Sequence, residues 1–167
     1  DGIDEYNETI VVDIAGVANA TEHGVQQVVA VVADDDGPPT VSLSLTGSPL
    51  AENGGSATVT ARLSNPSASL VTVNLAYSGS ATVNKDFAAS GNQILIPAGN
   101  TSGSATFSST DDAIDEPNET IEVDISGVTN GTEDGVQRIT AAIVDVVGRP
   151  PSSTRVTCST LSRSGGA

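Results

Sequence analysis

Acidic residues gather in turn-like parts of this sequence, at spacings that would let several carboxylates hold one cation. The densest group lies between Asp111 and Glu119, and an unbroken run stands at Asp34-Asp35-Asp36. Crowded carboxylates repel one another unless a cation neutralises them, and Ca2+ takes about six to eight oxygen ligands from such groups. The clusters as a whole therefore predict Ca2+ as the cofactor, although for any single acid turn geometry and solubility are the better explanation.

The charge balance excludes several classes of partner. The 167 residues carry 21 acids against 6 Lys and Arg, a net charge of −15. Nucleic acid and anionic membrane surfaces would repel such a chain. No apolar run in the sequence approaches the roughly 20 residues that span a bilayer, so we expect no direct membrane insertion.

Residues suited to catalysis are scarce. The one histidine, His23, lies in a turn, and Cys158 stands among Ser and Thr without a base beside it. Aromatic residues make up only 2% of the chain, too few for a sugar-binding platform beside paired carboxylates. The sequence is predicted not to be an enzyme.

The chain repeats itself at a shift of 111 positions. Residues 1–36 align with residues 112–147, and roughly 21 of these 36 positions are identical. This periodicity indicates a tandem array. We predict that 1–36 is the C-terminal remnant of one unit, that 37–148 is a complete unit, and that 149–167 is a linker or a disordered tail.

Alternating apolar and polar residues indicate β-strands throughout the complete unit, and no window has a helical period. Runs bounded by Gly, Pro, Asn and Asp predict seven strands, near 40–46, 55–64, 70–77, 92–96, 103–109, 119–126 and 136–145. Seven short strands in about 110 residues predict an all-β fold, an immunoglobulin-like Greek-key β-sandwich.

The direction of these strands predicts where the acids lie. Alternate strands of such a sandwich run roughly the same way, so the connections after the first, third, fifth and last strands meet at one end. Those are the acidic connections. The candidate metal ligands there are Glu52, Asp86, Asp111, Asp112, Glu116, Glu119 and Asp145.

Three segments resemble the Calx-β domain, a repeat of sodium/calcium exchangers, an integrin β subunit and many surface proteins. They are Ala51-Glu-Asn-Gly-Gly, Asn84-Lys-Asp-Phe with the later Ile94-Leu-Ile-Pro-Ala-Gly, and Asp112-Ala-Ile-Asp-Glu-Pro-Asn-Glu-Thr-Ile. The resemblance implies that calcium is held by Glu52, Asp86, Asp112, Glu116, Glu119 and Asp145. It also implies an extracellular or cell-surface location for a repeat of this type.

The two copies differ where the last strand ends. The first copy keeps Asp34-Asp35-Asp36, whereas the complete unit has Asp145-Val146-Val147. We therefore expect the complete unit to bind fewer ions or to bind them more weakly, and Asp34, Asp35 and Asp36 to form a site at the junction. Calcium there would stiffen the joint between units.

These features predict a calcium-binding structural or adhesive repeat of a larger extracellular or cell-surface protein. Two alternatives remain: a regulatory calcium sensor that acts on a partner domain, and a purely structural repeat without metal. The expected partners are neighbouring repeats of the same chain and other surface proteins. Because residues 1–36 duplicate the last two strands, they could also exchange with those strands in another copy, unless they are merely where a fragment was cut.

Overall fold

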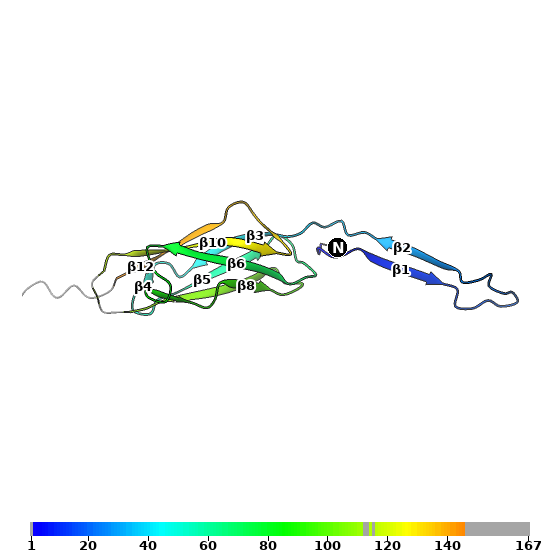
Figure 1. The fold of residues 1–167 in the computed structure, drawn as a ribbon, viewed down its shortest axis with the longest axis horizontal. Helices are drawn as coiled ribbons and strands as arrows, with labels where there is room; N and C mark the ends of the chain where they lie inside the picture. The colour runs from blue at the N-terminus through cyan, green and yellow to red at the C-terminus, as the bar shows by residue number, and fades with distance from the viewer. Residues whose placement is uncertain (1, 112–113, 115, 146–167) are drawn as a thin grey trace, which may run out of the picture.

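Two β-sheets face each other across one core, and a separate two-stranded hairpin extends from one end of them (Figure 1). The computed structural model describes residues 2–111, 114 and 116–145. Within that part of the chain no helix is long and apolar enough to cross a membrane. The predicted tail at 149–167 lies outside the described residues.

The first sheet has the order β4-β12-β10-β6-β8, and the second has the order β11-β3-β5-β9-β7. The bounds in the first sheet are β4 Leu50–Ala51, β12 Arg138–Val144, β10 Glu119–Thr129, β6 Val71–Gly79 and β8 Gln93–Ile96. Those in the second are β11 Thr132–Glu133, β3 Thr40–Thr46, β5 Ser56–Leu63, β9 Ser102–Ser109 and β7 Phe87–Ala89. This is the predicted immunoglobulin-like sandwich, so the fold class is confirmed.

Each of the seven expected strands is present, and three short ones are additional. The additional strands β4, β7 and β11 contain two or three residues each, too few for an alternating pattern to reveal. Strand β4 joins the first sheet by pairing in parallel with β12, although β3 before it belongs to the second sheet. The chain therefore crosses between the sheets before it reaches Glu52.

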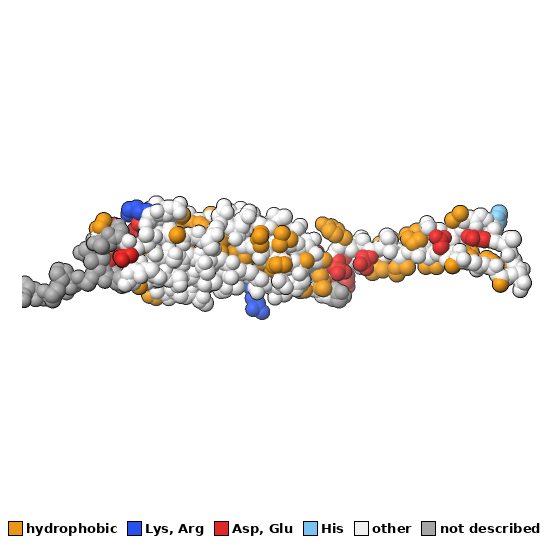
Figure 2. Space-filling model, turned by 90° about the horizontal axis from the view of Figure 1, so that it is seen from below, with side chains coloured by type: hydrophobic (Ala, Val, Ile, Leu, Met, Phe, Trp, Pro, Cys, Tyr) orange, Lys and Arg blue, Asp and Glu red, His pale blue; other side chains and the backbone are white. Residues whose placement is uncertain are grey.

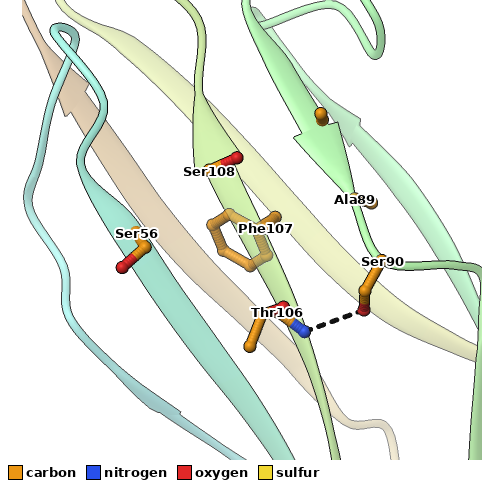
Figure 3. Close-up of a pocket in the computed structure, with 7 residues that line it drawn as sticks. Ser56, Ala89, Ser90, Thr106, Phe107 and Ser108 are labelled. Carbon is orange, nitrogen blue, oxygen red and sulfur yellow. Dashed lines mark hydrogen bonds between the residues drawn. The ribbon is translucent and has the colours of Figure 1, made fainter.

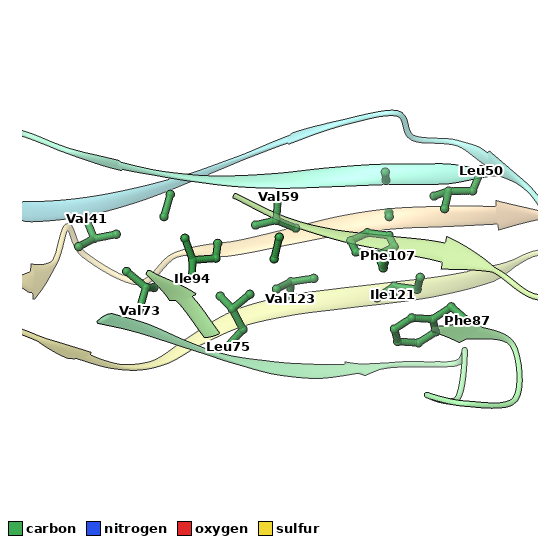
Figure 4. Close-up of a cluster of buried hydrophobic side chains, with 14 of the residues drawn as sticks. Val41, Leu50, Val59, Val73, Leu75, Phe87, Ile94, Phe107, Ile121 and Val123 are labelled. Carbon is green, nitrogen blue, oxygen red and sulfur yellow. The ribbon is translucent and has the colours of Figure 1, made fainter. Parts of the chain in front are cut away.

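The core lies between the two sheets and follows the alternation of the strands. In β5 the side chains of Ala57, Val59 and Ala61 are buried, while their neighbours are exposed or half-buried. Phe87 and Phe107 fill the core near the acidic connections (Figure 4), with ring centroids 6.0 Å apart in an edge-to-face arrangement. Such pairs add to the stabilisation that apolar burial provides.

The N-terminal hairpin consists of β1 (Glu8–Asp13) and β2 (Gln27–Val32), and every residue in both strands is exposed. Its base contacts the turn between β5 and β6. The Asp4 amide donates to the Pro66 carbonyl at 3.2 Å, and the Ala68 amide donates to the Asp4 carbonyl at 2.9 Å. This contact fixes the hairpin to the end of the sandwich where β3 begins.

Candidate functional site

Backbone hydrogen bonds draw the acidic connections together at the end of the sandwich remote from the hairpin. The Glu52 amide donates to the Val144 carbonyl at 3.0 Å, which places the turn after β4 beside the end of β12. Ser109 at the end of β9 donates to the Gly55 carbonyl, and Thr110 donates to the Asp86 carbonyl, each at 2.9 Å. We call this region the acidic end; its described acids are Glu52, Asp86, Asp111, Glu116, Glu119 and Asp145.

The glycines after Glu52 let that turn fold tightly. Gly54 has a φ of +95°, a conformation that favours glycine. A Cβ on Gly55 would lie 2.6 Å from the backbone N and O of Ala51. The turn therefore closes on itself and leaves the Glu52 side chain only 6% exposed. The shape of this turn thus accounts for the two glycines of the Glu-Asn-Gly-Gly segment.

Asp86 closes the loop that precedes β7. Its Oδ2 accepts the Thr82 amide at 2.7 Å, and its Oδ1 accepts the Lys85 ammonium at 3.0 Å. Burial by itself would raise the pKa of Asp86, but the hydrogen bonds from Thr82 and Lys85 outweigh it and hold that pKa below its usual range. Asp86 is therefore a stable anion with a role in the loop as well as at the acidic end.

Three carboxylates from two connections converge within reach of one ion. Oxygens of Asp86, Glu116 and Glu119 all lie within 4.8 Å of one another. Two oxygens that bind the same Ca2+ at 2.3–2.6 Å can be no farther apart than roughly 5 Å, so this spacing fits a shared cation. Asp145 adjoins the group, because its Oδ2 accepts the Glu116 amide at 3.1 Å.

A lysine that the sequence reasoning did not single out lies at this group. Lys85 is the one lysine of the chain. Its Nζ is 3.0 Å from Asp86 and 3.9 Å from Glu116. The hydrogen bond to Asp86, together with the charges of Asp86 and Glu116, raises the pKa of Lys85. The sequence did offer one signal for this contact, because Lys85 directly precedes Asp86 in a chain with few basic residues.

The other expected ligands lie differently. Asp111 is exposed and is not a member of the group formed by Asp86, Glu116 and Glu119. Asp112 lies outside the described residues. Glu52 lies at the same end and is buried. It directly follows β4, which pairs with β12, and β12 ends at the residue before Asp145.

A second acidic group stands at the junction between hairpin and sandwich (Figure 2). Oxygens of Asp34, Asp35 and Asp36 lie within 4.8 Å of one another. The Asp34 carboxylate accepts the Glu5 amide at 3.0 Å, and Asp145 makes the corresponding contact with the Glu116 amide in the sandwich. The nearest element of the sandwich is the turn after β5, since Asn65 donates to the Gly37 carbonyl at 3.2 Å. The two acidic groups therefore lie at opposite ends of the sandwich.

A surface hollow lies on the sheet that contains β5, β9 and β7 (Figure 3). It has a volume of about 270 Å³, and the Thr106 amide donates to Ser90 Oγ at 3.0 Å beside it. None of its lining residues is ionisable; they are Ser56, Ala88, Ala89, Ser90, Thr106, Phe107 and Ser108. Such a lining offers neither a charged metal ligand nor a general acid or base.

Comparison with known proteins places the fold and the family. The crystal structure of CBD12 from CALX1.2 superposes with a TM-score of 0.53 at 16% identity, covering 64% of this chain and 46% of that one. The apo-form Calx CBD1 domain gives a TM-score of 0.48 at 20% identity, covering 64% and 97%. This chain thus spans less than half the length of the CBD12 structure. No curated protein matches it.

The resemblance to Calx-β domains therefore holds for the fold, whereas the sequence matches a different family description. The model that matches residues 39–148, more than half of the sequence, is that of the LapA domain. The chain belongs to the LapA domain family.

Proposed function

We propose that this chain is a calcium-binding structural or adhesive unit of a larger extracellular or cell-surface protein. The observation that carries the proposal is the convergence of Asp86, Glu116 and Glu119 within 4.8 Å. Carboxylate oxygens at this spacing are the ligands that Ca2+ prefers. Glu52 and Asp145 at the same end supply further oxygens toward the six to eight that Ca2+ requires.

The proposed mechanism is mechanical. The acidic end joins the turn after β4, the loop before β7, the start of β10 and the end of β12. An ion held by carboxylates from these connections would cross-link them and oppose their separation. A bound ion also stabilises the folded state by mass action, by about 2.7 kcal/mol at a concentration 100 times its Kd.

We further propose that such units occur in tandem, with residues 1–36 supplying the last two strands of a neighbouring unit. The match of 1–36 to 112–147 in sequence supports this. Calcium held by Asp34, Asp35 and Asp36 would lie at the joint and restrict its bending. A longer tandem chain would then have a greater end-to-end length with calcium than with chelator in small-angle scattering, and equal lengths would exclude the stiffening.

Calorimetric titration of the full chain with CaCl2 tests the proposal. Glu116→Gln keeps the shape of the side chain but removes a charge from the acidic end, so it should abolish or weaken the heat of binding. The matched control is Glu133→Gln at the far end of the sandwich, where the residue accepts the Gln137 amide and a glutamine oxygen can do the same. Absence of heat in the parent chain, or equal loss in both variants, would contradict calcium binding at the acidic end.

Lys85 favours a second candidate, a purely structural unit. Its ammonium already supplies a positive charge to Asp86 and Glu116, so the acidic end has an internal counter-charge. In that case the titration gives no heat with any variant. A regulatory sensor differs from a spacer by affinity: a low-micromolar Kd is typical of sensors, whereas extracellular modules bind in the millimolar range.

A further inference from the structure

The β1–β2 hairpin reproduces the β10–β12 hairpin in three dimensions. Strand β1 pairs with β2 in the register Glu8↔Val32 to Asp13↔Gln27, and β10 pairs with β12 in the equivalent register Glu119↔Ile143 to Asp124↔Arg138. Positive φ values recur at Asn19 (57°) and Asn130 (58°). The hairpin thus pairs in the same register as β10 and β12, although no second sheet covers it in the part of the chain that the structure describes.

The two hairpins differ in what covers them. Ile121 and Val123 of β10 are 0% exposed, whereas the equivalent Ile10 and Val12 of β1 are 53% and 58% exposed. The same contrast holds in the second strand, where Ile143 is 3% exposed and Val32 is 47% exposed. The hairpin therefore presents to solvent the side chains with which β10 and β12 line the core. Scattered exposed valines are ordinary, but a complete core face is not.

We propose that this face, formed by Ile10, Val12, Val28, Ala30 and Val32, is a docking surface for the body of another sandwich of the same family. The body means the strands equivalent to β3–β9, in the slot that β10 and β12 fill here. This inference deepens the proposed array, and it rests on the assignment of residues 1–36 to a neighbouring unit. The occupant follows from the internal equivalence: β10–β12 shows which surface such a hairpin covers.

The opposite face of the hairpin supplies the contrast that makes the proposal specific. Val11 is 54% exposed, nearly the same as Val12. Its equivalent in β10, however, is Glu122, whose carboxylate lies 3.6 Å from Arg138 on the surface. We therefore expect two adjacent valines of similar exposure to have different roles in docking: Val12 is buried against the partner, and Val11 stays on the surface.

The short linker opposes docking of the hairpin into the sandwich that follows it in the chain. In the slot, the position equivalent to Asp34 is that of Asp145 at the acidic end, whereas β3 begins at Thr40 at the other end. The six residues from Asp34 to Thr40 reach about 20 Å when fully extended. That barely matches the length of β3, and the path must also cross the roughly 10 Å between the sheets. The body of another sandwich avoids this strain, because its slot is not reached through this linker.

The slot is occupied in the intact chain, so the test opens it. Val123→Asp in the full chain places a charge in the core and should displace the β10–β12 hairpin. With EGTA present, this variant should associate to at least twice the mass of the monomer by light scattering and retain a cooperative thermal transition. The double variant Val12→Asp/Val123→Asp should lose both, and the control Val11→Asp/Val123→Asp should keep both.

Three results would overturn the proposal: a Val123→Asp chain that is unfolded and monomeric, association that is independent of Val12, or association of the unmodified chain through Val12. The last would mean that two hairpins pack on each other instead of on a sandwich body. Because chelator is present throughout, the outcome is independent of the calcium titration, and either proposal can fail while the other stands.

Discussion

Truncation of one isoleucine in each hairpin separates the effect of sequence from the effect of burial. Ile10 and Ile121 occupy equivalent positions in the 111-residue repeat, each in the motif Asn-Glu-Thr-Ile. Ile121 is fully buried in the core, whereas Ile10 is 53% exposed. The substitutions Ile121→Ala and Ile10→Ala therefore remove the same atoms at equivalent positions in two different environments.

The magnitudes follow from burial. Ile→Ala removes three carbons, and at about 0.8 kcal/mol for each buried methylene the transfer loss at Ile121 is about 2.4 kcal/mol. The cavity left behind brings the loss of unfolding free energy to about 3–4 kcal/mol. At Ile10 no cavity forms, and the hairpin lies outside the core of the sandwich, so we expect a loss below about 0.5 kcal/mol.

Urea unfolding followed by far-UV circular dichroism measures both changes. With an m-value of about 1–3 kcal/mol/M, Ile121→Ala should lower the urea midpoint by about 1–4 M, whereas Ile10→Ala should lower it by less than about 0.5 M. Unchanged m-values would show that the midpoints report stability. Equal losses in the two variants would refute the reasoning, because they would mean that the hairpin face is already buried in solution.

Three further substitutions probe the acidic end. Asp86→Asn removes a carboxyl group whose pKa is lowered in the folded state. In the wild type this carboxylate stabilises the fold above its unfolded pKa of about 3.9, and the contribution disappears as the pH falls through the lower folded pKa. The variant should therefore be less stable than wild type above about pH 4, and the gap should close below it in urea unfolding across pH. Lys85→Gln removes the ammonium that competes with a cation, so calorimetry should show roughly two- to fivefold tighter calcium binding. Gly79→Ala places a Cβ 2.2 Å from the Thr120 carbonyl oxygen at a φ of +113°, and it should destabilise the fold by more than about 2 kcal/mol in thermal unfolding.

Each of these has a control or a contrary result. A constant difference between Asp86→Asn and wild type from low to neutral pH would mean that the charge of Asp86 does not contribute. Unchanged or weaker calcium binding by Lys85→Gln would show that the ammonium does not oppose the ion. Gly127→Ala is the match for Gly79→Ala, because the nearest atom to its added Cβ is 3.8 Å away; equal losses at both glycines would exclude a steric cause at Gly79.

Local pattern predicts most of the strands but not how the sheets are joined. Alternation with a period of two is visible in any run of five or more residues, which is why β5 and β6 were predicted within a residue or two. Strand β4 has only two residues, and its pairing with β12 depends on a segment about 90 positions away. No local signal encodes that partner.

Strand direction likewise predicts the end at which the acids lie, but not the distances among them. The expected connections do meet there, because alternate strands share a direction. The paths of the loops then decide that Asp86, Glu116 and Glu119 converge while Asp111 is exposed. They also bring Lys85 within 3.9 Å of Glu116, a residue distant from it in sequence, and no local pattern encodes that contact.

The sequence by itself determined where the longer strands lie along the chain, the 111-residue repeat and the acidic character of the connections, because these depend on residue type and spacing along the chain. Only the tertiary structure decided which carboxylates lie close enough together to bind one cation, and which copy of the hairpin packs against a second sheet. Ile10 and Ile121 follow the same three residues, Asn-Glu-Thr, but Ile10 is 53% exposed and Ile121 is fully buried. Burial depends on the surface that packs against a residue, and that surface belongs to other strands.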